Sequence, residues 1–360
     1  MRRQARAQPE IVSTQGISLQ FINLNSNPHM PLRIYYPVCL GLDIAKAKID
    51  ACLESDSAQH QISVENSSAG CKKLLRWLRK LCPQSVPVVM EATGTYGDLA
   101  AAFFHENGYW VSVINPRWIK DYGRSEGRRN KTDQQDARLI AAYGRTHLLD
   151  RWLPAAPEVA ELRALVRRLN TVEELIQGEA RRQEIAPAIA TLRKSLGRVA
   201  KALKAEQQLL EKAIRAHLAA HPSLAADCAR LQAIEGIGAK TARALVAELP
   251  RHLPGSRAAA AWVGVTPRRH ESGTSIHKPS RIGREGNQQL RRALYMPAVV
   301  ARSRNPRMKA FADRLELAGK SKLAAVIAVL HKLVRISFAM LKNNSSYDPN
   351  HHPQPSLPTR

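Results

Sequence analysis

Hydrophobic and polar residues change period repeatedly between residues 37 and 150. Short apolar runs predict buried strands, and the longer stretches between them have apolar residues at helical spacing. This alternation of strand and helix is typical of an α/β domain whose sheet is covered on both faces. The predicted elements are a strand–turn–strand over 38–54, a helix over 69–81, a strand ending at Glu91, a helix over 95–108 closed by Gly108, a strand within 109–116 and, after a basic segment, a helix from about Thr132.

The pattern becomes helical after residue 157. Two long segments rich in Ala, Leu, Arg and Glu have imperfect heptad spacing, and Pro187 separates them. They predict an antiparallel helical hairpin over 157–222. Such a hairpin can serve as a scaffold, as a dimer contact or as a surface lying on nucleic acid.

A compact unit follows, with the sequence LQAIEGIGAKTARALVAELP at 231–250. The Gly-Ile-Gly between two helical pieces is typical of a helix-hairpin-helix, in which backbone N–H groups approach a phosphate without obstruction by side chains. Gly236, Gly238 and Lys240 are the candidate contacts, although a plain helix–turn–helix corner has the same pattern. The remainder of a 228–342 domain is predicted as helix, a loop rich in Gly, Ser and Arg, and further helices.

Both ends of the chain lack a regular pattern. Residues 1–36 are polar and aperiodic and predict a disordered leader. Residues 343–360 are rich in Pro, Ser, Asn and His and predict a disordered tail.

The charge balance points to a polyanionic partner. Lys and Arg number 55 against 30 Asp and Glu, so the net charge is +25 and the pI is about 10.4. No continuous run of 18 apolar residues and no signal peptide are visible, which favours nucleic acid over a membrane. Five cysteines without a CxxC motif favour a reducing, cytoplasmic location with free thiols.

Four acids stand where strand ends and a helix start can bring them together. Asp43 follows CLGL in the first strand, Glu91 ends a buried strand, and Asp133 and Asp136 open a helix. Residues three apart share a helix face, about 5–6 Å apart at Cβ. Each acid alone has a structural explanation, since acids at a helix start are stabilised by its dipole. Together they predict a site for Mg²⁺, or Mn²⁺, suited to phosphodiester chemistry.

Basic residues surround the paired acids. They are either a solvated loop or contacts to the nucleic-acid backbone, and the overall charge favours the second interpretation. The residues are Arg117, Lys120, Arg124, Arg128, Arg129 and Lys131.

A second basic group occupies residues 264–297. Ser272 lies among its cations, where a hydroxyl can act as a nucleophile on phosphorus because cations stabilise the alkoxide. An ordinary loop serine fits the same pattern. The cations are Arg268, Arg269, Lys278, Arg281, Arg284, Arg291 and Arg292.

Five ordered segments within residues 38–342 resemble the DEDD transposases of bacterial insertion sequences of the 110/1111 type, the bridge-RNA-guided recombinases. The segments are GLDIAKAKID, VVMEATGTY, KTDQQDARLIAAYG, LQAIEGIGAKTARALVAELP and AAWVGVTPRRHESGTSIHKPSRIGREGNQQLRRALYMPA.

The resemblance implies a fold and a set of roles. A RuvC-like domain of RNase H-like fold would span 37–150, a coiled coil 157–222 and a mostly helical transposase domain 228–342. The acidic tetrad would be Asp43, Glu91, Asp133 and Asp136, and Ser272 would attack DNA and form a covalent link. A structured non-coding RNA, a homodimer or homotetramer and a nucleoid-associated cytoplasmic location are also implied.

Two other classes of function remain open at this stage. A metal-dependent endonuclease or Holliday-junction-type resolvase would use the acids without a covalent serine intermediate. A non-catalytic nucleic-acid-binding protein would need neither.

Overall fold

The structure is a computed structural model of the whole chain, and the chain divides into two compact units, Met1–Pro154 and Ala155–Arg360. The description covers residues 10–14, 17–22, 33–92, 94–127, 133–272, 276–283 and 285–348. Side chains are described for residues 36–92, 94–127, 135–267, 281–283 and 285–348.

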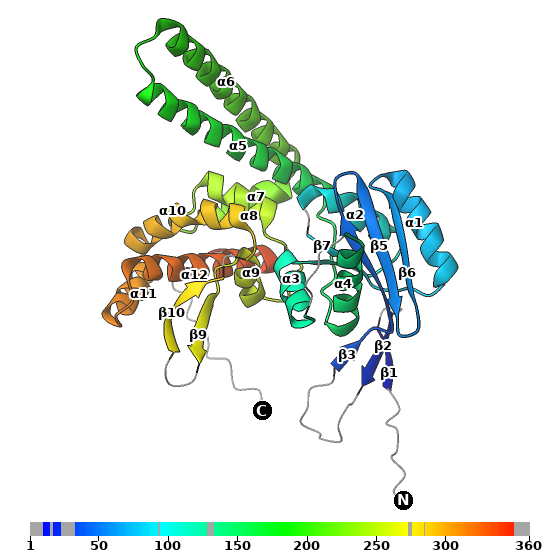
Figure 1. The fold of residues 1–360 in the computed structure, drawn as a ribbon. Helices are drawn as coiled ribbons and strands as arrows, with labels where there is room; N and C mark the ends of the chain where they lie inside the picture. Colours follow the sequence, from blue (N-terminus) through cyan, green and yellow to red (C-terminus); the bar gives the residue numbers. More distant parts are fainter. Residues whose placement is uncertain are drawn as a thin grey trace, which may run out of the picture. The chain divides into compact units, whose positions relative to one another are not determined.

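The first unit is built on a mixed five-stranded sheet in the order β6-β5-β4-β7-β8, of which β5, β6 and β7 are labelled in Figure 1. Strand β4 (Val38–Ile44) is central; β5 (Lys48–Ser55) pairs with it antiparallel, and β6 (Gln59–Glu65) pairs antiparallel with β5. On the other side, β7 (Val88–Glu91) is parallel to β4, and β8 (Val111–Ile114) is parallel to β7. The strand at 59–65 was not predicted, because its exposed polar residues hide the strand pattern.

The two faces of this sheet are covered differently. Large residues such as Leu40 and Leu42 of β4 pack under α1 (Ser68–Leu81) and α2 (Asp98–Glu106), together with Phe104. On the opposite face, α4 (Asp133–Thr146) lies on small residues, while α3 (Pro116–Ser125) contributes Ile119 to the core there. Helix α3 occupies part of the expected basic loop, because Asn115 caps it and Pro116 suits its first turn.

Helix α4 approaches the sheet unusually closely at Gly41. A Cβ at that position would lie 2.3 Å from the carbonyl oxygen of Ala137 and 2.4 Å from the nitrogen of Ala141. At Gly144, a Cβ would lie 2.5 Å from the Sγ of Cys39. Only a hydrogen atom fits at either glycine, so these two residues set the distance between helix and sheet.

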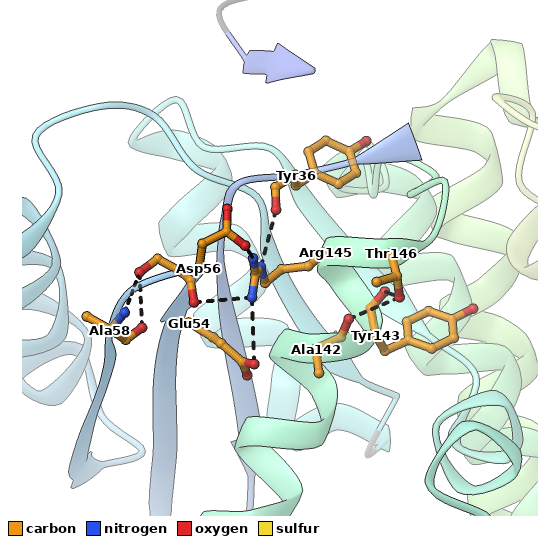
Figure 2. A network of polar contacts seen from close by, with 9 residues as sticks. Tyr36, Glu54, Asp56, Ala58, Ala142, Tyr143, Arg145 and Thr146 are labelled. Carbon is orange, nitrogen blue, oxygen red and sulfur yellow. Dashed lines mark hydrogen bonds and ion pairs between the residues drawn. The ribbon is translucent and has the colours of Figure 1, made fainter. Parts of the chain in front are cut away.

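Arg145, in the last turn of α4, is buried and links the helix to the sheet (Figure 2). Its guanidinium donates to the carbonyl oxygens of Tyr36 at 3.4 Å and Ser55 at 3.2 Å, and it pairs with Asp56. Glu54 lies 3.8 Å from the same guanidinium. Burial raises the pKa of Glu54, whereas Arg138 and Arg145 lower it.

Replacing Arg145 with Gln should lower the free energy of unfolding by about 2–4 kcal/mol. The substitution removes the cation beside the Glu54 carboxylate and the donor to the carbonyl oxygens of Tyr36 and Ser55. Urea unfolding followed by circular dichroism measures the loss. Arg76→Gln is the matched control, since Arg76 is exposed on α1 of the same unit and its replacement should change stability by no more than about 0.5 kcal/mol. Equal stability of the two variants would contradict the structural role of Arg145.

The N-terminal segment contains strands where the sequence predicts disorder. Strands β1 (Glu10–Thr14), β2 (Ile17–Ile22) and β3 (Arg33–Tyr35) form a three-stranded antiparallel sheet. β-Branched residues and Phe21 within these short segments favour pairing.

The second unit is helical apart from one hairpin. The predicted helical hairpin is present as α5 (Pro157–Ile185) and α6 (Ala190–Ala220), which run side by side in Figure 1. Its base shares a hydrophobic core with the rest of the unit, so 157–222 and 228–342 do not separate into two compact bodies. The remaining helices are α7 (Pro222–Gln232), α8 (Ala239–Glu248), α9 (Ser256–Val263), α10 (Gln288–Arg304), α11 (Pro306–Leu317) and α12 (Lys322–Asn343).

The basic loop predicted after α9 is instead a β-hairpin of β9 (Pro267–Ser272) and β10 (Ile276–Ile282). Pairing between the two strands stabilises this hairpin, and the residue composition of either segment alone does not predict a strand. The tail also differs from its prediction at its start: Asn305 donates to the hydroxyl of Tyr347 at 3.0 Å. Residues 349–360 lie outside the described part.

Helix α12 is long and apolar enough to cross a membrane by length and composition. Half of its most apolar window is buried within the second unit, and Leu333, Val334 and Phe338 belong to the hydrophobic core. A core helix explains its composition.

Candidate active site

The carboxylate of Asp43 stands near the end of β4 on the face covered by α4. Side chains alternate along a strand, so Asp43 shares its face with Gly41, which contacts α4. Asp43 is half-buried and lies directly opposite Asp50 of β5 in the antiparallel register. Two carboxylates therefore meet at one cross-strand position.

Glu91 reaches the same edge from the neighbouring strand. Because Leu42 of β4 is level with Met90 of the parallel strand β7, the next residue pair is Asp43 and Glu91. Val89 lies on the α4 face, where it faces Gly144. Glu91, two residues further along, points to that face as well.

The direction of α4 brings its first turn over this edge. Gly144 lies over Cys39, and Ala137 and Ala141 lie over Gly41. Continuing in that direction, the helix start lies toward Asp43. The helix begins at Asp133, whose side chain lies outside the described residues, and Asp136 in its first turn is half-buried.

The four predicted acids therefore come from three segments that end at one edge of the sheet. Among the side chains that are described, no group of three or more His, Cys, Asp or Glu residues is close enough to hold a metal ion. Asp43, Glu91 and Asp136 are among these side chains, and that of Asp133 is not. The fold brings the segments together, and the arrangement of the full tetrad remains a prediction.

Asp50 is a fifth carboxylate at this edge that the sequence analysis did not single out. It is only 5% exposed and pairs with Lys48 at 3.0 Å. With Gln61 and Ser63 of β6 and Ala137 of α4, it lines a small cavity of about 130 Å³ beside the helix. The signal available in the sequence was an acid at an inward position of an apolar strand, in KIDACLE.

The predicted basic residues before α4 are placed only in part. Arg117 and Arg124 on α3 pair with Asp121 at 3.4 and 3.5 Å, and Lys120 of the same helix is exposed. These exposed pairs leave the two guanidinium groups accessible to solvent. Arg128, Arg129 and Lys131 lie outside the described residues.

The Gly-Ile-Gly turn between α7 and α8 gives its two glycines different roles. Gly236 has φ +101°, and a Cβ there would lie 2.8 Å from the carbonyl oxygen of Pro297, so packing alone requires this glycine. Gly238 precedes the first residue of α8 and faces open space. The helix start beside Gly238 is therefore the part of the turn that an anion can approach.

Several candidate cations of the second unit are engaged within the protein. Lys240 pairs with Glu173, and Arg292 pairs with Glu174 at 2.7 Å. Arg291 donates to the carbonyl oxygen of Val263 at 2.8 Å, which caps α9. Arg281 is exposed on β10.

Ser272 ends β9, where its backbone is level with Ile276 of β10. Arg268 and Lys278 lie on the same hairpin, and the side chains of all three are outside the described part. The same holds for Arg269, and for Arg284 as a whole. The serine thus sits at the turn end of a hairpin rather than within an irregular loop.

Known proteins match almost the whole chain. One family model, described as "Transposase", matches residues 40–185, and a second, described as "Transposase IS116/IS110/IS902 family", matches residues 228–313. The pilin gene-inverting protein of Moraxella bovis is 32% identical over 318 residues, which are 87% of this chain and 98% of that protein. The chain belongs to the IS116/IS110/IS902 family of transposases. It is therefore an enzyme that acts on DNA.

Two further similarities are more distant. The transposase for insertion sequence element IS1111A of Coxiella burnetii is 25% identical over 352 residues, covering 86% of this chain and 90% of that protein. A solved structure of T. thermophilus RuvC in complex with Holliday junction substrate aligns with 29% of this chain and 89% of that chain. The sequence identity of this match is 13% and its TM-score is 0.24.

Proposed function

We propose that this transposase cleaves and exchanges DNA strands with four carboxylates in its first unit and a serine nucleophile in its second. The carboxylates are Asp43, Glu91, Asp133 and Asp136, and the nucleophile is Ser272. The observation that supports the proposal best is the meeting of β4, β7 and the start of α4 at one edge of the sheet. Strand ends and a helix start are the places from which a rigid scaffold can present several acids to one substrate.

The first unit is proposed to have the RNase H-like, RuvC-like fold. Three antiparallel strands, β4 to β6, are followed by two strands parallel to β4 in the order β6-β5-β4-β7-β8. The proposal rests on this order and on the family assignment.

The chemistry of the carboxylates fits a divalent cation. Asp43, Glu91 and Asp136 offer hard oxygen ligands from one face, and Asp133 belongs to the same helix turn as Asp136. These four residues would hold Mg²⁺, with Mn²⁺ as the usual substitute. When bound, the cation would stabilise negative charge on the oxygens of the phosphate undergoing transfer.

Ser272 is proposed to form the covalent link to DNA. Its hydroxyl gives up a proton as the Oγ–P bond forms, and the bond from phosphorus to one deoxyribose oxygen breaks. That oxygen leaves with a proton, which the acids help to position. Attack by the deoxyribose hydroxyl of another strand then reverses the step, restores the serine and joins the exchanged strands.

Replacing Ser272 with Ala should abolish a covalent protein–DNA adduct while DNA binding is retained, because the hydroxyl contributes little to affinity. The adduct is measured by denaturing gel electrophoresis of protein incubated with labelled DNA in Mg²⁺.

Ser280 of the adjoining strand is the matched control, and its Ala variant should still form the adduct. An adduct that persists in Ser272→Ala would reject this nucleophile. Mg²⁺-dependent cleavage in the Ser272→Ala variant, without any adduct, would instead support the endonuclease or resolvase mechanism.

The remaining parts of the proposal concern partners. A structured non-coding RNA, a homodimer or homotetramer and a nucleoid-associated cytoplasmic location are proposed from the family resemblance. RNA that copurifies with the protein, survives washing in high salt and is lost on RNase treatment would support the first of these.

A further inference from the structure

Four cations gather where α11 meets α12, and none of them is among the residues predicted to bind nucleic acid. Arg307 and Arg314 lie on α11, seven residues apart and therefore on one face, with Phe311 between them. Lys332 and Arg335 lie three residues apart on α12. Lys332 Nζ is 3.8 Å from the centroid of the Phe311 ring, which shows that the two faces meet. These four residues are called the α11–α12 cation cluster.

Among the described residues, the helices that form this cluster carry few carboxylates. Neither α10 nor α12, both fully described, contains any Asp or Glu. The two acids of α11 point elsewhere: Glu316 pairs with Arg302 of α10, and Asp313 lies about 120° around the helix from Arg307. Within the described part of the chain, the ion pairs include none of the four cations.

The cations are held together by uncharged groups. The Phe311 ring makes cation–π contacts with both Lys332 and Arg314, whose guanidinium carbon lies 5.6 Å from the ring centroid. Arg335 donates to the hydroxyl of Ser256 at 3.3 Å. Such contacts offset only part of the mutual repulsion between like charges at close range.

Lys332 is both half-buried and close to the three arginines. Burial lowers its pKa, and Arg307, Arg314 and Arg335 lower it further. The neighbouring His331 is affected in the same direction, by burial and by Arg335. An anion bound here would remove the repulsion and favour the charged ammonium group.

We propose that the α11–α12 cation cluster binds the phosphodiester backbone of a nucleic acid. Guanidinium groups match the geometry of phosphate oxygens, and an ammonium group adds a point charge between them. The proposal rests on the assignment of this chain as an enzyme acting on DNA. It does not depend on the acidic tetrad or on Ser272.

Binding without catalysis tests the site. Fluorescence anisotropy of a labelled DNA duplex, measured in EDTA, gives the dissociation constant at several salt concentrations. We expect Lys332→Met and Arg307→Gln each to weaken binding about five-fold at 150 mM salt. Each should also lower the slope of log K against log salt concentration by about 0.9, the value for one lost phosphate contact. A labelled RNA hairpin forms the second arm, and a loss confined to one of the two polymers identifies the source of the phosphate.

Lys309→Met is the matched control. Lys309 is an exposed lysine on the same helix, about 160° around the axis from Arg307. Its loss changes the net charge equally, so it should alter affinity less than two-fold. Unchanged affinity in both cluster variants, or an equal loss in Lys309→Met, would overturn the proposal.

Stability and titration separate a binding role from a structural one. Removing the Lys332 charge relieves repulsion, so Lys332→Met should melt at the same temperature as the wild type or higher. If the variant melts lower, NMR of the wild-type protein carrying ¹³C-methylated lysines decides the matter. The Lys332 signal should titrate at higher pH when DNA or RNA is present, and an unchanged titration would reject the site.

Discussion

Asp43→Asn should reduce Mg²⁺-dependent DNA strand cleavage by about 10³-fold and leave DNA affinity within two-fold of the wild type. The substitution keeps the size of the side chain and removes only its negative charge. Asn is a much poorer ligand for a hard cation than a carboxylate. Cleavage of labelled DNA and its anisotropy in EDTA measure the two quantities separately.

The position of Asp43 makes this effect specific. It lies level with Glu91 on one side and opposite Asp50 on the other, beneath the start of α4. Asn fits the space that Asp occupies, so the variant should fold as the wild type does, and its melting temperature checks this. Lost activity in a fully folded protein would therefore be a loss of chemistry.

Glu106→Gln is the matched control in the same unit. Glu106 is exposed at the end of α2, a helix that covers the opposite face of the sheet. This variant should cleave DNA as the wild type does. Normal cleavage by Asp43→Asn would remove the basis of the carboxylate site.

Gly41→Val should lower the free energy of unfolding of the first unit by about 3 kcal/mol or more, equivalent to a fall in melting temperature of about 6–12 °C. Valine is among the best strand formers, so local propensity alone predicts a gain. The backbone of α4 prevents that gain, because it lies 2.3–2.4 Å from the position of the new Cβ. Differential scanning calorimetry measures the change.

The same substitution should also reduce cleavage in the protein that remains folded. Helix α4 must move away from the sheet, and it carries Asp133 and Asp136. Gly197→Ala on α6 is the control, since no atom lies within 4 Å of a Cβ there. It should gain about 0.5–1 kcal/mol. A Gly41→Val protein as stable as the wild type would show that the helix–sheet contact is not this close.

The predicted elements of the first unit agree well with the structure where apolar runs are continuous. The strand ending at Glu91 and the helix starting near Thr132 were both predicted to within a residue. The edge strand over 59–65, the helix over 116–125 and the hairpin over 267–282 were missed. In those segments polar and basic residues face solvent, so the one-dimensional pattern of burial is weak.

Charge and motif order, read from the sequence alone, determined that this protein acts on a polyanion and resembles the transposase family to which it belongs. Local patterns also placed three of the acids at strand ends or a helix start. The register of β4 against β5 and β7, however, decided that Asp50 joins Asp43 and Glu91 at one edge. Packing of α11 against α12 likewise brings Arg307 and Arg314 close to Lys332 and Arg335. Sequence fixes charge and local periodicity, but only tertiary packing brings residues distant along the chain close enough for their charges to act together.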